Sequence, residues 1–233
     1  MCGRYILRQI AEAERYFGLR RVEWHFTASF NIAPTLMVPV VRLGKDGVRE
    51  GLMMRWGLIP YWAHGEVPKF STINATIEKL ETAAAWRGPW ERGRRCIIPA
   101  NAFYEWHLGV DGAKNPYLIE LADQPLFGFA GLWDGSRRDD GTVVRSCTIV
   151  TMPGNALMRD IHNTGSNPYR MPAILRADDH ETWLSGTADK AKSVLQQYPD
   201  DRMHAYRVST RVNSTKNDDA QLTEPVEPSV SSG

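Results

Sequence analysis

The chain has 233 residues, of which 42% are hydrophobic and 24% are charged, so it contains enough apolar material for a folded core. Its formal net charge of +1 excludes a protein that binds nucleic acid through an overall basic surface, and any DNA contact has to be confined to a local groove. No apolar run is long enough to cross a bilayer and the first residues lack a secretory pattern, so we expect a cytoplasmic protein without membrane contact, associated with the nucleoid if it is bacterial.

The hydrophobic patterns predict a chain that consists mainly of strands. Helices are expected at residues 9–17, at about 76–87 with a stop at Gly88-Pro89, from residue 178 and at 188–197. Strands are expected at residues 38–42, 51–56, 94–99, 117–121, 126–133, 143–151 and 203–209. Neither a repeat nor a linker divides this order, which indicates one α+β domain over residues 2–213, mainly antiparallel, followed by a flexible polar tail at 214–233.

Three cysteines, Cys2, Cys96 and Cys147, are odd in number and far apart in the sequence. This spacing argues against a disulfide framework, and the absence of a Cys-x-x-Cys pair argues against zinc, so neither a metal nor a cofactor is expected. Cys96 and Cys147 lie in strand-like segments and are expected to be small buried hydrophobic residues.

Cys2 has a chemistry of its own if Met1 is removed, because it then carries a free α-amine beside its thiol. With a reference pKa of about 8, a fraction of the amine is neutral at pH 7 and can attack an aldehyde to give an imine. The adjacent thiol can then close a thiazolidine ring rapidly, since it is already positioned. A second residue is uninformative by its position alone, but Gly3 permits a tight turn and residues 5–7 can anchor the terminus in the core.

Eight short motifs follow one another along the chain. They are Met1-Cys2-Gly3-Arg4-Tyr5; Asn31-Ile32-Ala33-Pro34-Thr35; Arg55-Trp56-Gly57-Leu58-Ile59-Pro60-Tyr61-Trp62; Ile73-Asn74-Ala75 with Glu78 and Trp86-Arg87; Arg95-Cys96-Ile97-Ile98-Pro99-Ala100 with Phe103-Tyr104-Glu105-Trp106; Phe129-Ala130-Gly131-Leu132-Trp133; Thr148-Ile149-Val150-Thr151; and His162 with Arg170-Met171-Pro172. In content and order they resemble the SOS-response-associated peptidase (SRAP) family, over about residues 2–213.

The resemblance implies a compact, barrel-like, mainly antiparallel β fold with peripheral helices and a narrow positive channel for single-stranded DNA. Members of the family form a covalent DNA–protein crosslink at abasic sites and so protect these sites during DNA repair and the SOS response. Some members also cut the strand by β-elimination, a lyase activity, and the peptidase name reflects a proposed self-processing. We therefore expect an abasic-site crosslinking enzyme that acts as a monomer on single-stranded DNA containing abasic sites.

The resemblance assigns four catalytic residues, Cys2, Asn74, Glu105 and His162. An abasic sugar is mostly a closed hemiacetal, so its ring has to be opened by an acid and a base before the aldehyde can react. His162 is the candidate for ring opening. Glu105 is the candidate acid and base beside the Cys2 amine, with a pKa raised by its aromatic neighbours. Asn74 would orient the sugar or the Cys2 backbone.

Each assignment has a structural alternative. A single histidine such as His162 is more often structural than catalytic. Glu105 could instead be a buried charge paired with Arg94 or Arg95. Asn74 could simply cap a following helix.

On the same resemblance, DNA contacts fall to five residues. Arg4, Arg87 and Arg170 would bind phosphates, Trp62 would stack on bases, and Thr151 lies in a matched segment. Three other tryptophans are expected in the core: Trp56, Trp106 and Trp133.

Two positions depart from the family pattern. Thr76 stands where members often carry an arginine, so one phosphate contact is either lost or supplied from elsewhere in the chain. Residues 163–169 intervene between His162 and Arg170, where many members have a single residue, and their Gly-Ser-Asn-Pro turn is expected to bulge outward and leave His162 in place.

Three other functions compete with abasic-site crosslinking. An amino-terminal-nucleophile amidohydrolase would also use Cys2, with its thiol as nucleophile and its α-amine as base. A non-covalent module for single-stranded DNA would bind reversibly and form no adduct. A thiol protease would combine Cys2 with His162 in a peptide cleft, of which the sequence gives no sign.

Overall fold

Five strands close into a barrel. In the computed structural model, which describes residues 2–226, β4 (Met37–Leu43) pairs antiparallel with β5 (Arg49–Trp56) and with β7 (Arg95–Ala100). Strand β7 continues the ring to β10 (Phe127–Arg137), and β10 to β11 (Val143–Pro153). The ring closes because β11 pairs in parallel with β5 through Ser146 and Cys147. Residues that alternate along these strands therefore point into one shared core.

Four short strands extend this sheet: β2 (Arg21–Val22), β6 (Asn74–Thr76), β12 (Arg170–Pro172) and β13 (Ile174–Leu175). Strand β2 pairs with β5, and β13 pairs with β10. Strands β6 and β12 both pair with the last residues of β11, β6 in parallel and β12 in the antiparallel direction. The end of β11 therefore brings residues 74–76 and 170–172 side by side.

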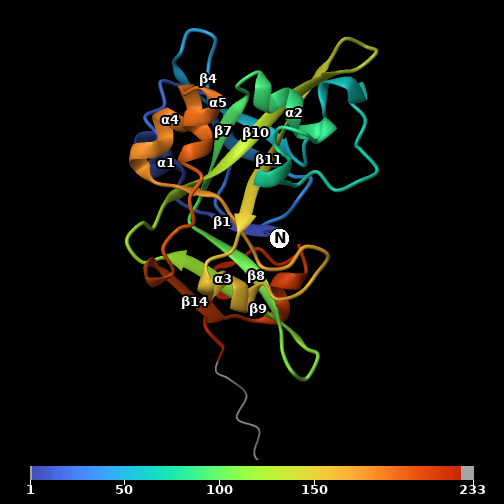
Figure 1. The fold of residues 1–233 in the computed structure, drawn as a ribbon. Helices are drawn as coiled ribbons and strands as arrows, with labels where there is room; N and C mark the ends of the chain where they lie inside the picture. The colour runs from blue at the N-terminus through green and yellow to red at the C-terminus, as the bar shows by residue number, and fades with distance from the viewer. Residues whose placement is uncertain (1, 227–233) are drawn as a thin grey trace, which may run out of the picture.

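A second, antiparallel sheet lies below the barrel in Figure 1. Its order is β14 (Met203–Arg207), β9 (Lys114–Leu121), β8 (Ala102–Leu108), β1 (Arg4–Leu7) and β3 (Ser29–Ile32). Strand β7 of the barrel leads into β8 after a single residue, so the two sheets are directly connected. Because β1 pairs with β8, the amino terminus lies at the junction of the two sheets (Figure 1).

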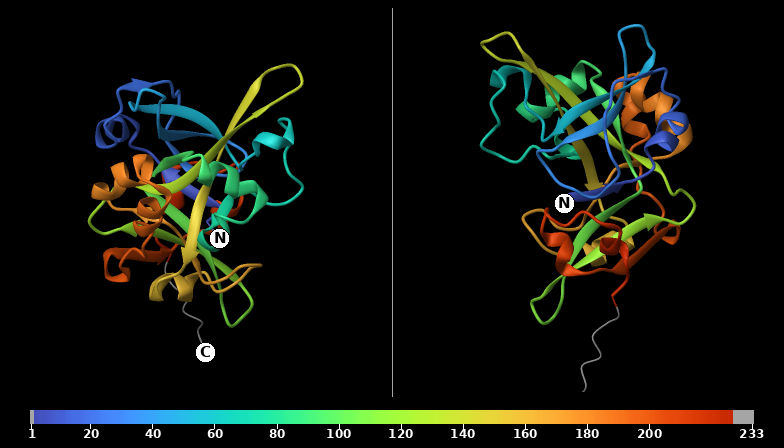
Figure 2. Two further views of the ribbon diagram at one scale, coloured as in Figure 1. Left: turned by 45° about the horizontal axis from the view of Figure 1, so that its top comes forward. Right: turned by 180° about the vertical axis from the view of Figure 1, so that it is seen from behind.

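The helices are short and lie at the periphery, as Figure 2 shows from two further sides. They are α1 (Ile10–Tyr16), α2 (Ala84–Glu91), α3 (Ala156–Ile161), α4 (His180–Ser185) and α5 (Ala188–Ser193). Single 3-10 turns occur at Tyr61–Ala63, Ile77–Lys79, Ala177–Asp179, Asp200–Arg202, Thr210–Asn213 and Ala220–Thr223. Within residues 2–226, no helix has the length and apolar character that a membrane crossing requires.

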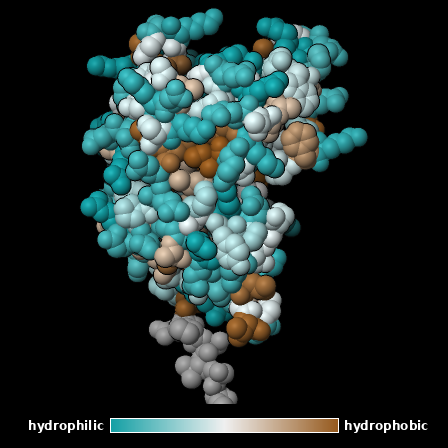
Figure 3. Space-filling view, in the orientation of Figure 1, coloured by the Kyte–Doolittle hydropathy of each residue, from teal (hydrophilic) through white to brown (hydrophobic). Residues whose placement is uncertain are grey.

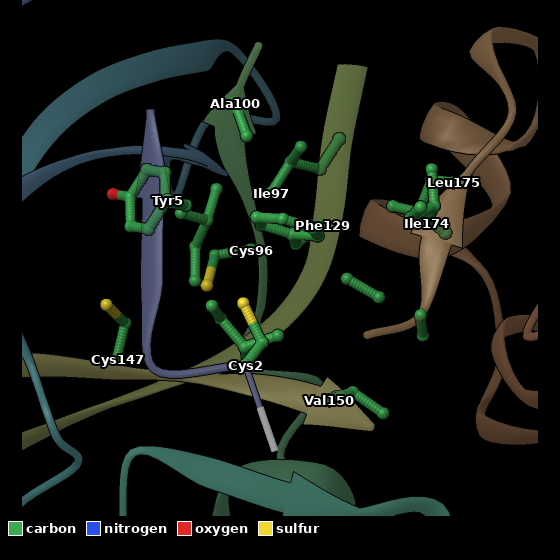
Figure 4. Packing of buried hydrophobic residues seen from close by; sticks show 14 of the residues in the cluster. Cys2, Tyr5, Cys96, Ile97, Ala100, Phe129, Cys147, Val150, Ile174 and Leu175 are labelled. Carbon is green, nitrogen blue, oxygen red and sulfur yellow. The ribbon is translucent and has the colours of Figure 1, made fainter. Parts of the chain in front are cut away.

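Aromatic rings and two thiols fill the core beside β1. The Tyr5 ring meets the rings of Trp56 and Phe129 edge-on, with centroids 5.3 and 5.9 Å apart. Cys96 and Cys147 are fully buried free thiols, as predicted. Figure 4 shows both sulfurs in the same cluster as Cys2. Burial of an aromatic side chain of this size stabilises a fold by about 2–3 kcal/mol, so Tyr5 anchors the terminal strand firmly.

The expected mainly antiparallel barrel is confirmed, and each strand expected from the sequence is present. The helix expected at 76–87 is wrong: residues 74–76 form strand β6, and α2 begins only at Ala84 and runs through Gly88-Pro89. Thr76, the first residue of the expected helix, pairs with Thr151 of β11, and residues 77–79 form a single 3-10 turn. Pro89 is tolerated because it is buried against the core and the helix ends two residues later.

The packed structure continues beyond residue 213, which was the expected end of the domain. The Asn31 side-chain amide donates to the carbonyl oxygens of Val212, Ser214 and Asn217, at 3.2, 3.0 and 2.9 Å. Leu222 is fully buried, and the Val226 N–H donates to the Arg207 carbonyl oxygen at 2.9 Å. The polar composition of the segment after residue 213 gave no indication of these contacts. Of the expected tail, residues 227–233 lie outside the described residues.

Candidate active site

Cys2 is buried directly before β1, with 1% of its surface exposed. Its thiol lies 3.7 Å from the Arg4 carbonyl oxygen, and its own carbonyl oxygen accepts a hydrogen bond of 3.0 Å from the Asn74 side-chain amide. Burial raises the pKa of the Cys2 thiol well above its ordinary value, and the Glu105 carboxylate raises it further. The resting thiol is therefore protonated. Met1 lies outside the described residues.

Glu105 stands on β8, one residue after Tyr104, which pairs with Arg4 across the sheet. It is 2% exposed, and burial raises the pKa of its carboxyl group to about 7. The alternative of an ion pair with Arg94 or Arg95 finds no support. Arg94 pairs with Asp134, and Arg95 donates to main-chain carbonyl oxygens beside α4. Glu105 can thus carry or release a proton near neutral pH.

His162 follows the last residue of α3, and its ring is held by the main chain. Its main-chain N–H donates to the Met158 carbonyl oxygen at 2.9 Å, and its ring Nδ1 accepts from the main-chain N–H of Arg170 at 3.1 Å. The neutral ring therefore carries its proton on Nε2, which lies 3.9 Å from Glu105 Oε2. Burial lowers the pKa of His162 to about 4, so the ring is neutral at pH 7.

The seven residues between His162 and Arg170 form a loop that leaves His162 in place. The Tyr169 N–H donates to the His162 carbonyl oxygen at 2.7 Å, next to the bond from Arg170 to the ring. Both ends of the loop therefore meet at His162. Asn163, at the start of the loop, bonds to Leu108 of β8, and the outward bulge expected from the turn residues stays a prediction.

Asn74 belongs to strand β6, where it pairs with Ile149, so it is not the cap of a helix. It is buried, and its side-chain Oδ1 has no hydrogen-bond partner among the residues that the structure describes, whereas its Nδ2 holds Cys2. The fully buried Oγ1 of Thr151 is likewise without a partner within residues 2–226. Buried acceptors of this kind are costly unless a ligand satisfies them.

Arg170 is buried in a pair with Glu78 and does not face solvent. Two parallel bonds of 2.7 and 2.9 Å join its guanidinium to the Glu78 carboxylate, and a third of 2.8 Å reaches the Thr151 carbonyl oxygen. Only 8% of Arg170 is exposed. In this arrangement the side chain joins β12 to the 3-10 turn after β6, and its own N–H orients His162.

The other residues assigned to DNA lie further out. Trp62 is 41% exposed and its Nε1 lies 3.4 Å from the Ala84 carbonyl oxygen at the start of α2. Arg87 is exposed on α2. Arg4 is half-buried and donates to the Gly3 carbonyl oxygen at 3.0 Å. Thr76, at the departure from the family pattern, is also half-buried.

A hollow of about 300 Å³ gives access to the two titratable groups. It is lined by Glu105, Trp106, Lys114, His162 and Thr164. Trp106 is half-buried against the small cluster that contains Ile6 and Tyr104, at the edge of the core expected for it, and its Nε1 donates to Asn213 Oδ1 at 2.9 Å. No sequence signal indicated Lys114 or Thr164, because only the folded chain brings the β8–β9 hairpin and the loop 163–169 together. Trp56 is fully buried as expected, whereas Trp133 is half-buried beneath Arg42.

A family model described as SOS response associated peptidase (SRAP) matches residues 1–215. The chain belongs to the SRAP family. Among its relatives, the abasic site processing protein YoqW of Bacillus subtilis is 37% identical over 231 residues, covering 96% of this chain and 99% of the relative. YoaM of the same organism, also named abasic site processing protein, is 36% identical over 95% of this chain and 97% of the relative.

More distant relatives keep the family relationship. The abasic site processing protein HMCES of Gallus gallus is 29% identical over 97% of this chain and 78% of its own length. A crystal structure of a protein from Bordetella bronchiseptica superposes with a TM-score of 0.79 at 30% identity, covering 89% of this chain and all of the other. One from Bacteroides thetaiotaomicron gives 0.83 at 25% identity, over 97% of this chain and all of the other. The SRAP barrel and its second sheet are therefore shared across distant bacteria.

Proposed function

We propose that this SRAP protein captures abasic sites in single-stranded DNA as a covalent thiazolidine crosslink at Cys2, and so protects them during repair and the SOS response. The observation that carries the proposal is the convergence of four buried side chains at the start of β1. Asn74 holds the Cys2 carbonyl group at 3.0 Å, and His162 Nε2 lies 3.9 Å from the Glu105 carboxyl group. Relatives over nearly the whole chain are named abasic site processing proteins, which supports the choice of substrate.

Ring opening is the first step that these residues can perform. The Glu105 carboxylate takes the proton of the hemiacetal hydroxyl, the C1′–O4′ bond breaks, and the aldehyde forms. A neutral His162 cannot readily give up its Nε2 proton, but it can donate a hydrogen bond to the departing O4′. Glu105 then returns the proton to O4′. A carboxyl group with a pKa of about 7 suits both directions of this transfer.

Addition of Cys2 follows once its α-amine is free. The neutral amine adds to C1′; one of its protons moves to the former carbonyl oxygen and the other to the Glu105 carboxylate. Glu105 then gives this second proton to the hydroxyl group, which leaves as water, and the imine forms. The thiol then passes its proton to the Glu105 carboxylate, its sulfur adds to C1′, and the ring nitrogen receives a proton. The sum is one amine, one thiol and one aldehyde converted to a thiazolidine and water. Asn74 fixes the Cys2 carbonyl group, which orients both nucleophiles.

The same site supports two further reactions, one after imine formation and one before Cys2 can react. An imine that is not captured by the thiol can lose the 3′ phosphate by β-elimination, which is a lyase activity. Release of Met1 is required before Cys2 can react, and we propose that the protein contributes to this step as a self-processing peptidase. Ring closure by the thiol competes with elimination, since it removes the imine. Because the Cys2 thiol is buried and protonated, ring closure requires Glu105 as the base that takes the thiol proton.

Incubation with abasic single-stranded DNA and denaturing electrophoresis test the proposal. The wild-type protein should give a shifted band, C2A none, and C2S a band only after borohydride trapping of the imine. Undamaged DNA of the same sequence is the control. Equal crosslinking of undamaged DNA, or full reactivity of protein whose measured mass retains Met1, would overturn the aldehyde chemistry. Reversible binding without an adduct would identify a non-covalent module, and Cys2-dependent release of glutamate from glutamine an amidohydrolase.

A further inference from the structure

The loop 163–169 is docked on the edge of strand β8. Asn163 makes the contact: its Oδ1 accepts from the Leu108 N–H at 2.8 Å, and its Nδ2 donates to the Leu108 carbonyl oxygen at 3.1 Å. Strand β1 pairs with β8 only at residues 102–104, so the edge of β8 at Leu108 does not pair with β1. The His107 Nδ1 lies 3.0 Å from the Asp160 carbonyl oxygen and adds a second connection. The loop is therefore held against the β8–β9 hairpin.

The docked loop and the hairpin each contribute one lining residue to the hollow that leads to Glu105 and His162. Thr164 comes from the loop, and Lys114 comes from the first residue of β9, where it pairs with Leu108. Figure 1 shows the hairpin and the segment after α3 on the same side of the molecule. In Figure 3 apolar surface marks the tip of the hairpin, where Leu108 and Val110 are exposed. Lys114 is exposed, lies opposite Leu108 next to the turn of the hairpin, and lines the hollow.

The charges around the hollow indicate what Lys114 can bind. An abasic sugar in a DNA strand carries a phosphodiester on each side, so at least one anion has to lie near the entrance. His162 is neutral, and the Arg170 guanidinium is bound to Glu78. Glu105 repels an anion whenever it is ionised. Among the five residues that line the hollow, Lys114 carries the positive charge that can bind this anion.

We propose that Lys114 and Thr164 form a clamp for the phosphodiester next to the abasic sugar, and that Asn163 positions this clamp by docking the loop on β8. The proposal rests on the proposed function and extends it to the way in which this chain holds the strand. The Lys114 ammonium group supplies charge, and the Thr164 hydroxyl group supplies a hydrogen-bond donor to a phosphate oxygen. A hollow of about 300 Å³ has room for one sugar-phosphate unit.

Crosslinking rates measured against DNA concentration test the charge. K114A should raise the half-saturating concentration of abasic single-stranded DNA by about 3- to 10-fold, K114E should raise it further, and K114R should restore it, while the maximal rate changes by less than about twofold. The dependence of the logarithm of affinity on that of salt concentration should become shallower by about 0.7. The matched control is K45A, since Lys45 is equally exposed in the β4–β5 turn at the opposite end of the molecule (Figure 1).

The docking of the loop is tested by N163A, alone and with K114A. N163A should raise the half-saturating concentration, and K114A should add less than its full effect in the double variant, because the loop and the lysine act as one clamp. Circular dichroism and melting temperature verify that each variant is folded. Unchanged half-saturation in K114A and K114E would overturn the clamp even though the wild type crosslinks. Absence of a crosslink in the wild type would instead overturn the proposed function.

Discussion

At the scale of single residues, the site depends on two groups that burial drives toward their neutral forms. Burial raises the pKa of Glu105 to about 7 and lowers that of His162 to about 4, so near pH 7 the imidazole is neutral and the carboxyl group is about half protonated. A proton can therefore reside on the carboxyl group, while the imidazole acts only through its Nε2–H. The family resemblance assigned ring opening to His162 and acid–base work beside the Cys2 amine to Glu105. Because the Arg170 N–H bonds to Nδ1, a contact that no sequence pattern shows, we propose that Glu105 also transfers the proton in ring opening.

The raised pKa of Glu105 makes protein stability depend on pH. The folded state holds this proton up to about pH 7, whereas the unfolded chain releases it near pH 4, so the contribution of this group is fully present below pH 4 and is lost as pH rises through 7. We expect E105Q, which cannot ionise, to stabilise the protein at pH 8 by roughly 2–3 kcal/mol and to slow crosslinking by about 10²-fold.

Chemical denaturation at pH 5 and pH 8 measures the effect of E105Q. The gain in the free energy of unfolding should appear only at pH 8, because the wild-type carboxyl group is already protonated at pH 5. An E105Q variant that is less stable than the wild type at pH 8 would show that Glu105 is stabilised as a carboxylate. A crosslinking rate equal to that of the wild type would remove Glu105 from the chemistry.

His162 is expected to matter for ring opening and not for later steps. H162A should therefore slow the reaction with a natural abasic site by about 10- to 100-fold, as expected for the loss of one donor to a developing oxyanion. On a strand that carries an open-chain aldehyde unable to cyclise, the same variant should react at nearly the wild-type rate. E105Q is the matched control, since it should remain slow on both substrates. Equal impairment of H162A on both would place His162 in imine formation instead.

At the scale of elements, the strands could be predicted from the sequence and the turns around the site could not. Runs of apolar residues marked β4, β5, β7, β10 and β11, because these strands are largely buried in the barrel. The helix expected from residue 76 was wrong at its start, since residues 74–76 pair with β11. That pairing joins residues about 75 positions apart in the chain, and no local pattern reports it. The same holds for the edge of β8, where Asn163 docks the loop.

Arg170 gives the clearest difference between assignments from sequence and from structure. As a phosphate contact it would govern affinity, whereas as the partner of Glu78 it holds β12 and, through its N–H, the His162 ring. We expect R170K to lower the maximal crosslinking rate several-fold and to change the half-saturating DNA concentration by no more than about twofold, because lysine cannot make the two parallel bonds. The salt dependence of binding should stay that of the wild type.

R170K could instead show a higher half-saturating concentration, an unchanged maximal rate and a shallower salt dependence. This result would show that Arg170 binds DNA phosphates. E78Q is the companion variant, since it weakens the same pair from the other side. Glu78 is half-exposed, so its loss should cost about 1 kcal/mol or less in the free energy of unfolding. Parallel kinetic effects in R170K and E78Q would confirm that the pair positions β12.

At the scale of the whole molecule, the segment after residue 213 completes the second sheet. Leu222 is fully buried in a small cluster with Ile6, Tyr104 and Leu118, on the side of β1 and β8 that faces away from the barrel core. Composition alone predicted a tail here, because the segment is polar and its packing depends on one leucine and on hydrogen bonds to the main chain. Strand β1, which carries Cys2, is thus covered on both sides, and the position of Cys2 depends on residues more than 200 positions away.

Truncation tests this dependence. A chain that ends at residue 213 loses the burial of Leu222 and the bonds from Asn31 to Ser214 and Asn217, which together contribute about 3 kcal/mol. For a domain of this size, that loss should lower the melting temperature by roughly 6–12 °C and slow crosslinking, because β1 is loosened. A chain ending at residue 226 is the control and should melt as the full chain does. If the chain ending at 213 also melts with the full chain, the segment contributes nothing to the fold, and Cys2 is positioned by the barrel side of β1 alone.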